Sequence, residues 1–143
     1  MTDVARTLQE LEGVAWAEPE WQSGLVTRCH KLRKKPLEDL TVGDLQTLLG
    51  QNIGARFLVP LALKVLEANP FAEGDYYPGD LLRSMLQSLD VYWKKQQEQL
   101  LRFHAVVDLA SEQLAREEDA SDTDLSLQIH IRSFRERCEF QFP

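Results

Sequence analysis

Cysteine and histidine are scarce in this sequence, and their positions exclude most of the sites that they build. The two cysteines, Cys29 and Cys138, stand far apart, with no CxxC pair and no histidine cluster beside them. We therefore expect two reduced thiols rather than a disulfide framework or a metal site. His30, His104 and His130 fall on three different predicted segments. Because adjacent helical residues point about 100° apart, Cys29 and His30 do not form a nucleophile and base.

The sequence also lacks the motifs of common enzymes and the long apolar run of a membrane protein. No HExxH, GxSxG, phosphate-binding loop or DxDxDG calcium loop occurs, which predicts a protein without catalytic residues or cofactor. The longest apolar stretch, residues 57–63, is interrupted by Pro60 and is far shorter than the roughly 20 residues that cross a bilayer. The first residues, Met1-Thr2-Asp3, do not resemble a signal peptide, so we expect a cytoplasmic protein.

The composition is that of an ordinary globular protein. Of the 143 residues, 43% are hydrophobic and 27% are charged, and this length suits one domain over residues 1–143. Apolar residues recur mainly at helical spacing, which predicts an all-α bundle of about six to seven helices. His104 lies within one of these apolar runs and is expected to be a hydrogen-bonded core residue.

Four helices are predicted in the first half of the chain. Thr2 or Asp3 can cap the first, over residues 2–12, and Glu18-Pro19-Glu20-Trp21 is typical of a loop or helix start before the second. Thr41 and Asp44 have the spacing of a capping box. The predicted spans are 2–12, 20–34, 42–50, and a central helix that follows a cap at Asn52, bends at Pro60 and closes at Asn69-Pro70.

The second half begins with a proline- and glycine-rich loop, residues 69–80, which Phe71, Tyr76 and Tyr77 are expected to pin to the body. Asp80 is predicted to cap a short helix that runs through Leu89. Asp90 is predicted to cap the longest helix, residues 91–117, which contains no proline or glycine. After a polar, acidic break, the tail from residue 124 has both strand-like alternation and a helical stripe. We expect a helix, because an isolated strand lacks a partner in a helical domain.

Acidic residues in the loop admit three interpretations. Glu73, Asp75 and Asp80 can form a metal or acid–base site, an acidic interface, or a structural set in which Asp80 caps a helix and Asp75 organises a turn. Tyr76 and Tyr77 stand among them, and large amphipathic residues contribute much of the binding energy in interfaces. We therefore place all five residues in a candidate protein-binding surface without a metal.

A second acidic group lies in residues 108–124. This stretch contains seven acidic residues and a single arginine, the strongest concentration of charge on the chain. It is either a solvated surface or a site that accelerates association with a basic partner. The candidate binding residues in it are Asp108, Glu112, Glu117, Glu118 and Asp119.

The overall charge points to the class of partner. At a net charge of −7, the chain does not offer phosphates the basic surface that nucleic acid requires, so a basic protein is the better partner. The basic run from Arg28 to Lys35 has no interleaved aromatic residues. We expect it to pair internally with carboxylates.

Several ordered blocks resemble one known family, the immunity proteins of contact-dependent growth inhibition systems. The resemblance extends from about residue 20 to about residue 93, whereas residues 1–15 and the tail after residue 118 match weakly. The blocks are LVTRCHKLRKKPL at 25–37, DL at 44–45, GQNIG at 50–54, LVPLAL at 58–63, NP at 69–70 and EGDYYPGDLL at 73–82.

The resemblance implies a helical bacterial protein that binds and neutralises the C-terminal toxin domain of a surface-displayed effector. Such toxins are often nucleases with basic clefts, which implies that an acidic inhibitor occludes the active site. Two other functions stay open at this point. One is a small helical hydrolase or metal-dependent enzyme, and the other is an acidic regulatory adaptor that binds a basic protein.

Overall fold

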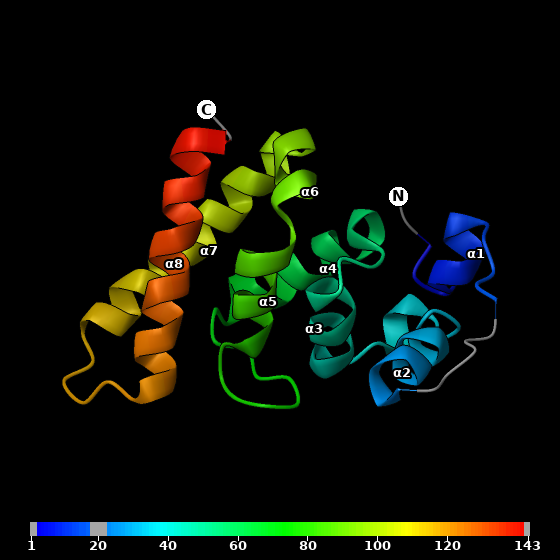
Figure 1. Ribbon diagram of the computed structural model, residues 1–143, viewed down its shortest axis with the longest axis horizontal. Helices are drawn as coiled ribbons and strands as arrows, with labels where there is room; N and C mark the ends of the chain where they lie inside the picture. Colours follow the sequence, from blue (N-terminus) through cyan, green and yellow to red (C-terminus); the bar gives the residue numbers. More distant parts are fainter. Residues whose placement is uncertain (1–2, 18–22, 142–143) are drawn as a thin grey trace.

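The computed structural model describes residues 3–17 and 23–141, and within them the regular secondary structure is helical (Figure 1). This part of the chain contains two isolated β-bridges, Thr7 with Pro36 and Glu73 with Pro78, but no strand. The all-α prediction is confirmed, and the described residues form eight α-helices rather than six to seven. They are α1 Leu8–Glu12, α2 Gly24–Leu32, α3 Val42–Gly50, α4 Ala55–Ala68, α5 Asp80–Ser88, α6 Asp90–Lys95, α7 Gln97–Ala115 and α8 Asp122–Gln141, with a 3-10 turn η1 at Leu37–Asp39.

The helix starts were predicted with mixed success. The Thr41 hydroxyl accepts from the Asp44 N–H and the Asp44 carboxylate accepts from the Thr41 N–H, so the capping box of α3 is confirmed. The first helix is shorter than predicted and begins after Thr7, whose hydroxyl accepts from the N–H of Glu10. Asp3 instead accepts from the nearby Ala5 N–H. Thr2, the predicted loop at 18–21 and the predicted helix start at 20 lie outside the described residues, and α2 is capped by Ser23.

The central helix α4 begins differently from the prediction. Its N-cap is Gly54 at φ 69°, and Asn52 also has a positive φ of 56°. The chain therefore turns twice through the left-handed region, and no side chain caps the helix. Pro60 lies inside α4 and Asn69 ends it, as predicted; the bend at Pro60 stays a prediction.

Asp80 and Asp90 do not cap helices, contrary to the prediction. Each is the first residue of its helix, after Gly79 and Leu89 respectively, and neither helix has a side-chain cap. The Asp80 carboxylate accepts from the backbone of the preceding loop, whereas Asp90 pairs with Arg137 of α8 at 2.8 Å. Both side chains satisfy groups elsewhere in the fold.

The predicted helix at 91–117 is divided at Gln96, whose φ of −129° and ψ of 67° are not helical. In a straight helix Trp93 and Phe103 would lie about 15 Å apart along the axis. Instead, the chain changes direction at the break, so that α6 packs against α7. The rings of Trp93 and Phe103 stack there with centroids 4.7 Å apart. This contact explains why the break occurs without glycine or proline. The longest helix is therefore α8, with 20 residues.

The ambiguous tail is helical, as predicted. Its apolar stripe of Leu127, Ile131 and Phe134 is buried, and α8 packs against α5 and α7. The start of α8 carries a reciprocal pair of hydrogen bonds between Ser121 and Asp124. Figure 1 shows α8 beside α7 at the far side of the molecule from α1 and α2.

One connected core joins these helices. It includes Leu8 of α1, Leu48 of α3, Leu63 of α4, Leu82 of α5 and Phe103 of α7, all fully buried. Helix α5 packs on α3 on one side and on α8 on the other. Within the described residues, no helix is long and apolar enough to span a membrane.

Candidate functional site

The two acidic segments predicted from the sequence lie close together in the fold. One shallow hollow is lined by Phe71 and Pro78 of the loop together with Glu117 and Asp124. A second is lined by Tyr77 of the loop and by residues at the start of α8, including Asp122. Figure 1 shows the loop before α5 and the turn between α7 and α8 at the same end of the molecule. We call this surface the acidic end, defined by the loop 69–79 and the turn 116–124.

The loop owes its shape to a buried carboxylate. Asp80 is 2% exposed, and it accepts hydrogen bonds from the Gly74 N–H at 2.7 Å and the Tyr76 N–H at 3.1 Å. The Tyr77 hydroxyl accepts from Arg83 of α5 at 2.8 Å. Of the three aromatic residues expected to pin the loop, Phe71 and Tyr77 are half-buried, but Tyr76 is 69% exposed. Tyr76 therefore projects from a loop whose backbone is fixed.

Asp75 ties the loop to α2 and, through Arg28, to α3. Its carboxylate lies 2.6 Å from Arg28 of α2, and the same guanidinium nitrogen lies 3.2 Å from Asp44 of α3. Lys35 reaches the other oxygen of Asp44 at 2.9 Å. Arg33 also pairs with Glu12 at 2.9 Å. The expectation of internal pairing is thus confirmed for Arg28, Arg33 and Lys35 of the basic run.

The loop and α3 also meet backbone to backbone at two glycines. A Cβ added to Gly74 would lie 3.0 Å from the Cα of Gly43, and one added to Gly43 would lie 2.3 Å from a carboxylate oxygen of Asp75. Neither position has room for a larger residue without displacing its neighbour. Sequence reasoning did not identify Gly43 or Arg28 as part of this site, because their partners are distant in the chain.

The three acidic residues of the loop have three different environments. Glu73 is exposed, Asp75 pairs with Arg28, and Asp80 faces inward to backbone amides. Among residues 3–17 and 23–139, no three histidine, cysteine or acidic side chains are grouped so that they could hold a metal ion. The loop is thus organised by amides and cations of the protein itself.

The predicted acidic stretch divides into paired and unpaired parts. Asp108 forms an ion pair with Arg135 at 2.8 Å, and Asp124 is used at the start of α8. Glu112, Glu117, Glu118 and Asp119 are exposed. The carboxylates available to a partner therefore lie mainly in the turn between α7 and α8.

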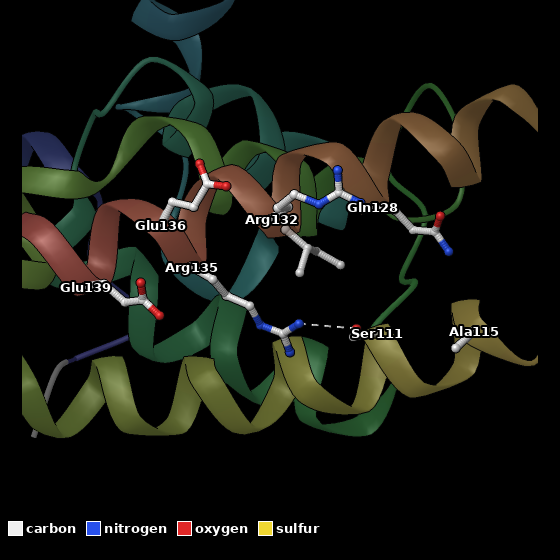
Figure 2. A pocket seen from close by; sticks show the side chains of 8 residues that line it. Ser111, Ala115, Gln128, Arg132, Arg135, Glu136 and Glu139 are labelled. Carbon is white, nitrogen blue, oxygen red and sulfur yellow. Dashed lines mark hydrogen bonds between the residues drawn. The ribbon is translucent and has the colours of Figure 1, made fainter.

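A groove between α7 and α8 was not predicted. It has a volume of about 400 Å³ and is lined by Ser111 and Ala115 on one side and by α8 residues of both charges on the other. Figure 2 shows Arg135 reaching across it to Ser111, whose hydroxyl accepts at 3.4 Å. The lining contains no histidine or cysteine, and Ser111 contacts a cation rather than a base, so the groove does not resemble a hydrolase site.

The histidines and cysteines lie in separate surroundings. His30 packs edge-on against Trp16, with ring centroids 5.2 Å apart, whereas Cys29 is buried in the core. Burial lowers the pKa of His104, which contacts Phe134 and is half-buried. Both cysteines are free; burial raises the pKa of Cys29 and raises that of Cys138 to about 11. Burial thus disfavours the reactive thiolate at both positions.

Asp44 gives the ion-pair network a pH dependence. Burial raises the pKa of Asp44, but hydrogen bonds from Lys35, the Thr41 N–H and Arg28 together hold it below its ordinary value of 3.8. A depressed folded-state pKa stabilises the protein above the unfolded-state value, and this contribution is lost as the pH falls through the folded-state pKa. We expect Asp44→Asn to lower the free energy of unfolding by about 1–3 kcal/mol at neutral pH.

Urea denaturation of both proteins between about pH 5 and about pH 3 tests this. The difference in unfolding free energy between wild type and Asp44→Asn is expected to shrink toward acid. A difference that stays constant over this range would contradict the assignment.

Comparison with known proteins identifies the family. Residues 10–103 match the family described as CDI immunity proteins, where CDI stands for contact-dependent growth inhibition. The match includes the loop 69–79 and ends before Asp108. No curated protein matches the sequence significantly. Because the family covers well over half of the chain, the resemblance of the sequence blocks is confirmed, and the chain belongs to the CDI immunity proteins.

Proposed function

We propose that the protein neutralises its toxin by binding the toxin domain at the acidic end and covering the active site, and that this toxin is a nuclease. The observation that carries the proposal is the convergence of the loop 69–79 with the turn 116–124. In this proposal residues 1–143 act as one domain in the cytoplasm. Inhibition requires binding alone and no reaction catalysed by the immunity protein.

Electrostatics supports a basic cleft as the target. A nuclease binds phosphates through cationic side chains, and a low-dielectric cleft concentrates that positive field. Glu73, Glu117, Glu118, Asp119 and Asp122 are exposed at the acidic end. Carboxylates presented there attract the same cations that hold the substrate, so the inhibitor and the nucleic acid compete for one surface.

Co-expression with the toxin domain encoded beside the immunity gene tests the immunity role. We expect rescue of growth and a stoichiometric complex on size-exclusion chromatography. If the toxin still kills and no complex forms, the proposal fails.

Inhibition kinetics test the mechanism separately. The purified toxin domain should degrade nucleic acid, and added immunity protein should suppress degradation competitively, so that more substrate weakens the apparent inhibition. Rescue of growth without nuclease activity would contradict the nuclease assignment. Inhibition that is independent of substrate concentration would contradict occlusion of the active site.

A further inference from the structure

We infer that Tyr76 is the principal anchor of the acidic end and inserts into a cationic pocket of the toxin domain. Arg28, Gly43 and Asp80 are positioning residues that keep the backbone around Tyr76 in place before the toxin binds. This inference rests on the proposed function and adds to it the chemistry of the partner pocket and a division of labour within the loop.

At Tyr76 an exposed side chain stands on a fixed backbone. The side chain is 69% exposed, although the backbone N–H is held by the buried Asp80 carboxylate at 3.1 Å. A tyrosine has few rotatable bonds, so fixing its ring in an interface costs little conformational entropy. A fixed backbone lowers that cost further, because the loop is already ordered before the partner binds.

The neighbours of Tyr76 are held by contacts with several helices. Asp80 also accepts from the Gly74 N–H, and Asp75 is bound to Arg28 at 2.6 Å. On the side of α3, the backbone of Gly43 lies against Gly74. The residues on both sides of Tyr76 are therefore tied to α2, α3 and α5, whereas its ring is exposed to a partner.

The charge near Tyr76 favours a cationic partner pocket. Exposed acids lie in the same loop, at Glu73, and in the neighbouring turn 116–124, and the face of an aromatic ring is itself negative. A lysine or arginine over that face gains cation–π attraction as well as proximity to carboxylates. The pocket that receives Tyr76 is thus lined by cations, as expected of a phosphate-binding cleft.

Affinity measurements with the full-length chain and the purified toxin domain test the anchor. We expect Tyr76→Ala to raise the Kd by about 30-fold or more, the loss typical of a central anchor. Leu101→Ala is the matched control, because Leu101 on α7 is also 69% exposed. It should change the Kd by less than about twofold.

Gly43→Ala tests the positioning residues without altering any polar group. The new methyl group must displace Asp75, and we expect the Kd to rise by about 3- to 10-fold through loss of loop order. Gly24→Ala makes the same change in the first turn of α2, where nothing lies within 4 Å of the added Cβ. It should leave the Kd unchanged.

The double variant separates positioning from direct contact. If Gly43 acts through Tyr76, then Gly43→Ala should change the Kd by less than about twofold when Tyr76 is already alanine. Equal effects in both backgrounds would overturn the positioning role. If Gly43→Ala does not fold, Arg28→Gln and Arg28→Lys serve instead. The lysine variant keeps a cation for Asp75 and should bind more tightly than the glutamine variant.

The outcomes distinguish this inference from the proposed function. Tight binding by wild type together with wild-type affinity of Tyr76→Ala would overturn the anchor and leave the proposed function intact. Equal losses from Tyr76→Ala and Leu101→Ala would also overturn it. If wild type itself does not bind the toxin domain, both fail together.

Discussion

Replacement of Trp93 by alanine is expected to lower the free energy of unfolding by about 3–5 kcal/mol, the largest stability effect of any single change proposed for this protein. Trp93 is fully buried and stacks on Phe103, and its indole N–H donates to the Met85 carbonyl. Truncation removes the ring, opens a cavity and leaves that carbonyl without this donor. It also removes the stacking contact that accompanies the break at Gln96.

Trp16→Ala is the control for this prediction. Trp16 is 39% exposed and lies with its ring 4.2 Å below the guanidinium carbon of Arg33, so its truncation should cost only about 1 kcal/mol. Chemical denaturation followed by circular dichroism gives both values. Equal losses for the two variants would contradict the assignment of Trp93 to the centre of the α6–α7 packing.

Reversal of charge at the turn between α7 and α8 is expected to slow association with the toxin domain. We expect Glu118→Lys combined with Asp119→Lys to reduce the association rate constant by about tenfold or more at low salt. Both side chains are exposed, so the change acts through the long-range field rather than through folding. At about 1 M salt, where the Debye length is about 3 Å, the two proteins should associate at similar rates.

The matched control reverses the same number of charges elsewhere. Glu38 and Asp39 are exposed on η1, close to the N-terminal segment, and their replacement by lysine changes the net charge equally. Stopped-flow mixing should show a smaller effect for this pair. If both double variants slow association equally, net charge rather than the acidic end controls the encounter.

Local sequence signals predicted helices well where the deciding side chain interacts within its own helix. The capping box of Thr41 and Asp44 fixed the start of α3, because both partners lie within one turn. The tail was correctly predicted as a helix because a lone strand would lack a partner, and its helical stripe is buried. In each case the deciding contacts are either local or follow from the period of the helix.

The predictions failed where a side chain serves another part of the fold. Asp80 and Asp90 have the residue type of a cap, but Asp80 accepts from loop amides four and six residues before it, and Asp90 pairs with Arg137 of α8. The break at Gln96 follows from the stacking of Trp93 on Phe103, which no window of sequence reveals. Tertiary packing overrides local preference at these positions.

The candidate site was likewise predictable from the sequence only in part. Its acidic residues were found by composition, since clustered charge is visible in any sequence. That the loop 69–79 lies beside the turn 116–124 depends on how α8 packs against α5, which the sequence does not state. The roles of Arg28 and Gly43 depend on contacts with residues of the loop more than 30 positions away in the chain.

The contact between Gly43 and Gly74 has a consequence for how such an inhibitor changes over evolutionary time. Where the two backbones are in contact, the base of the loop has no side chain that can vary. A substitution at either glycine therefore disturbs the packing of the loop on α3. The exposed ring of Tyr76 carries no such constraint on the fold. A protein built this way can follow a changing toxin by exchanging a residue at the tip while the base of the loop is inherited unaltered.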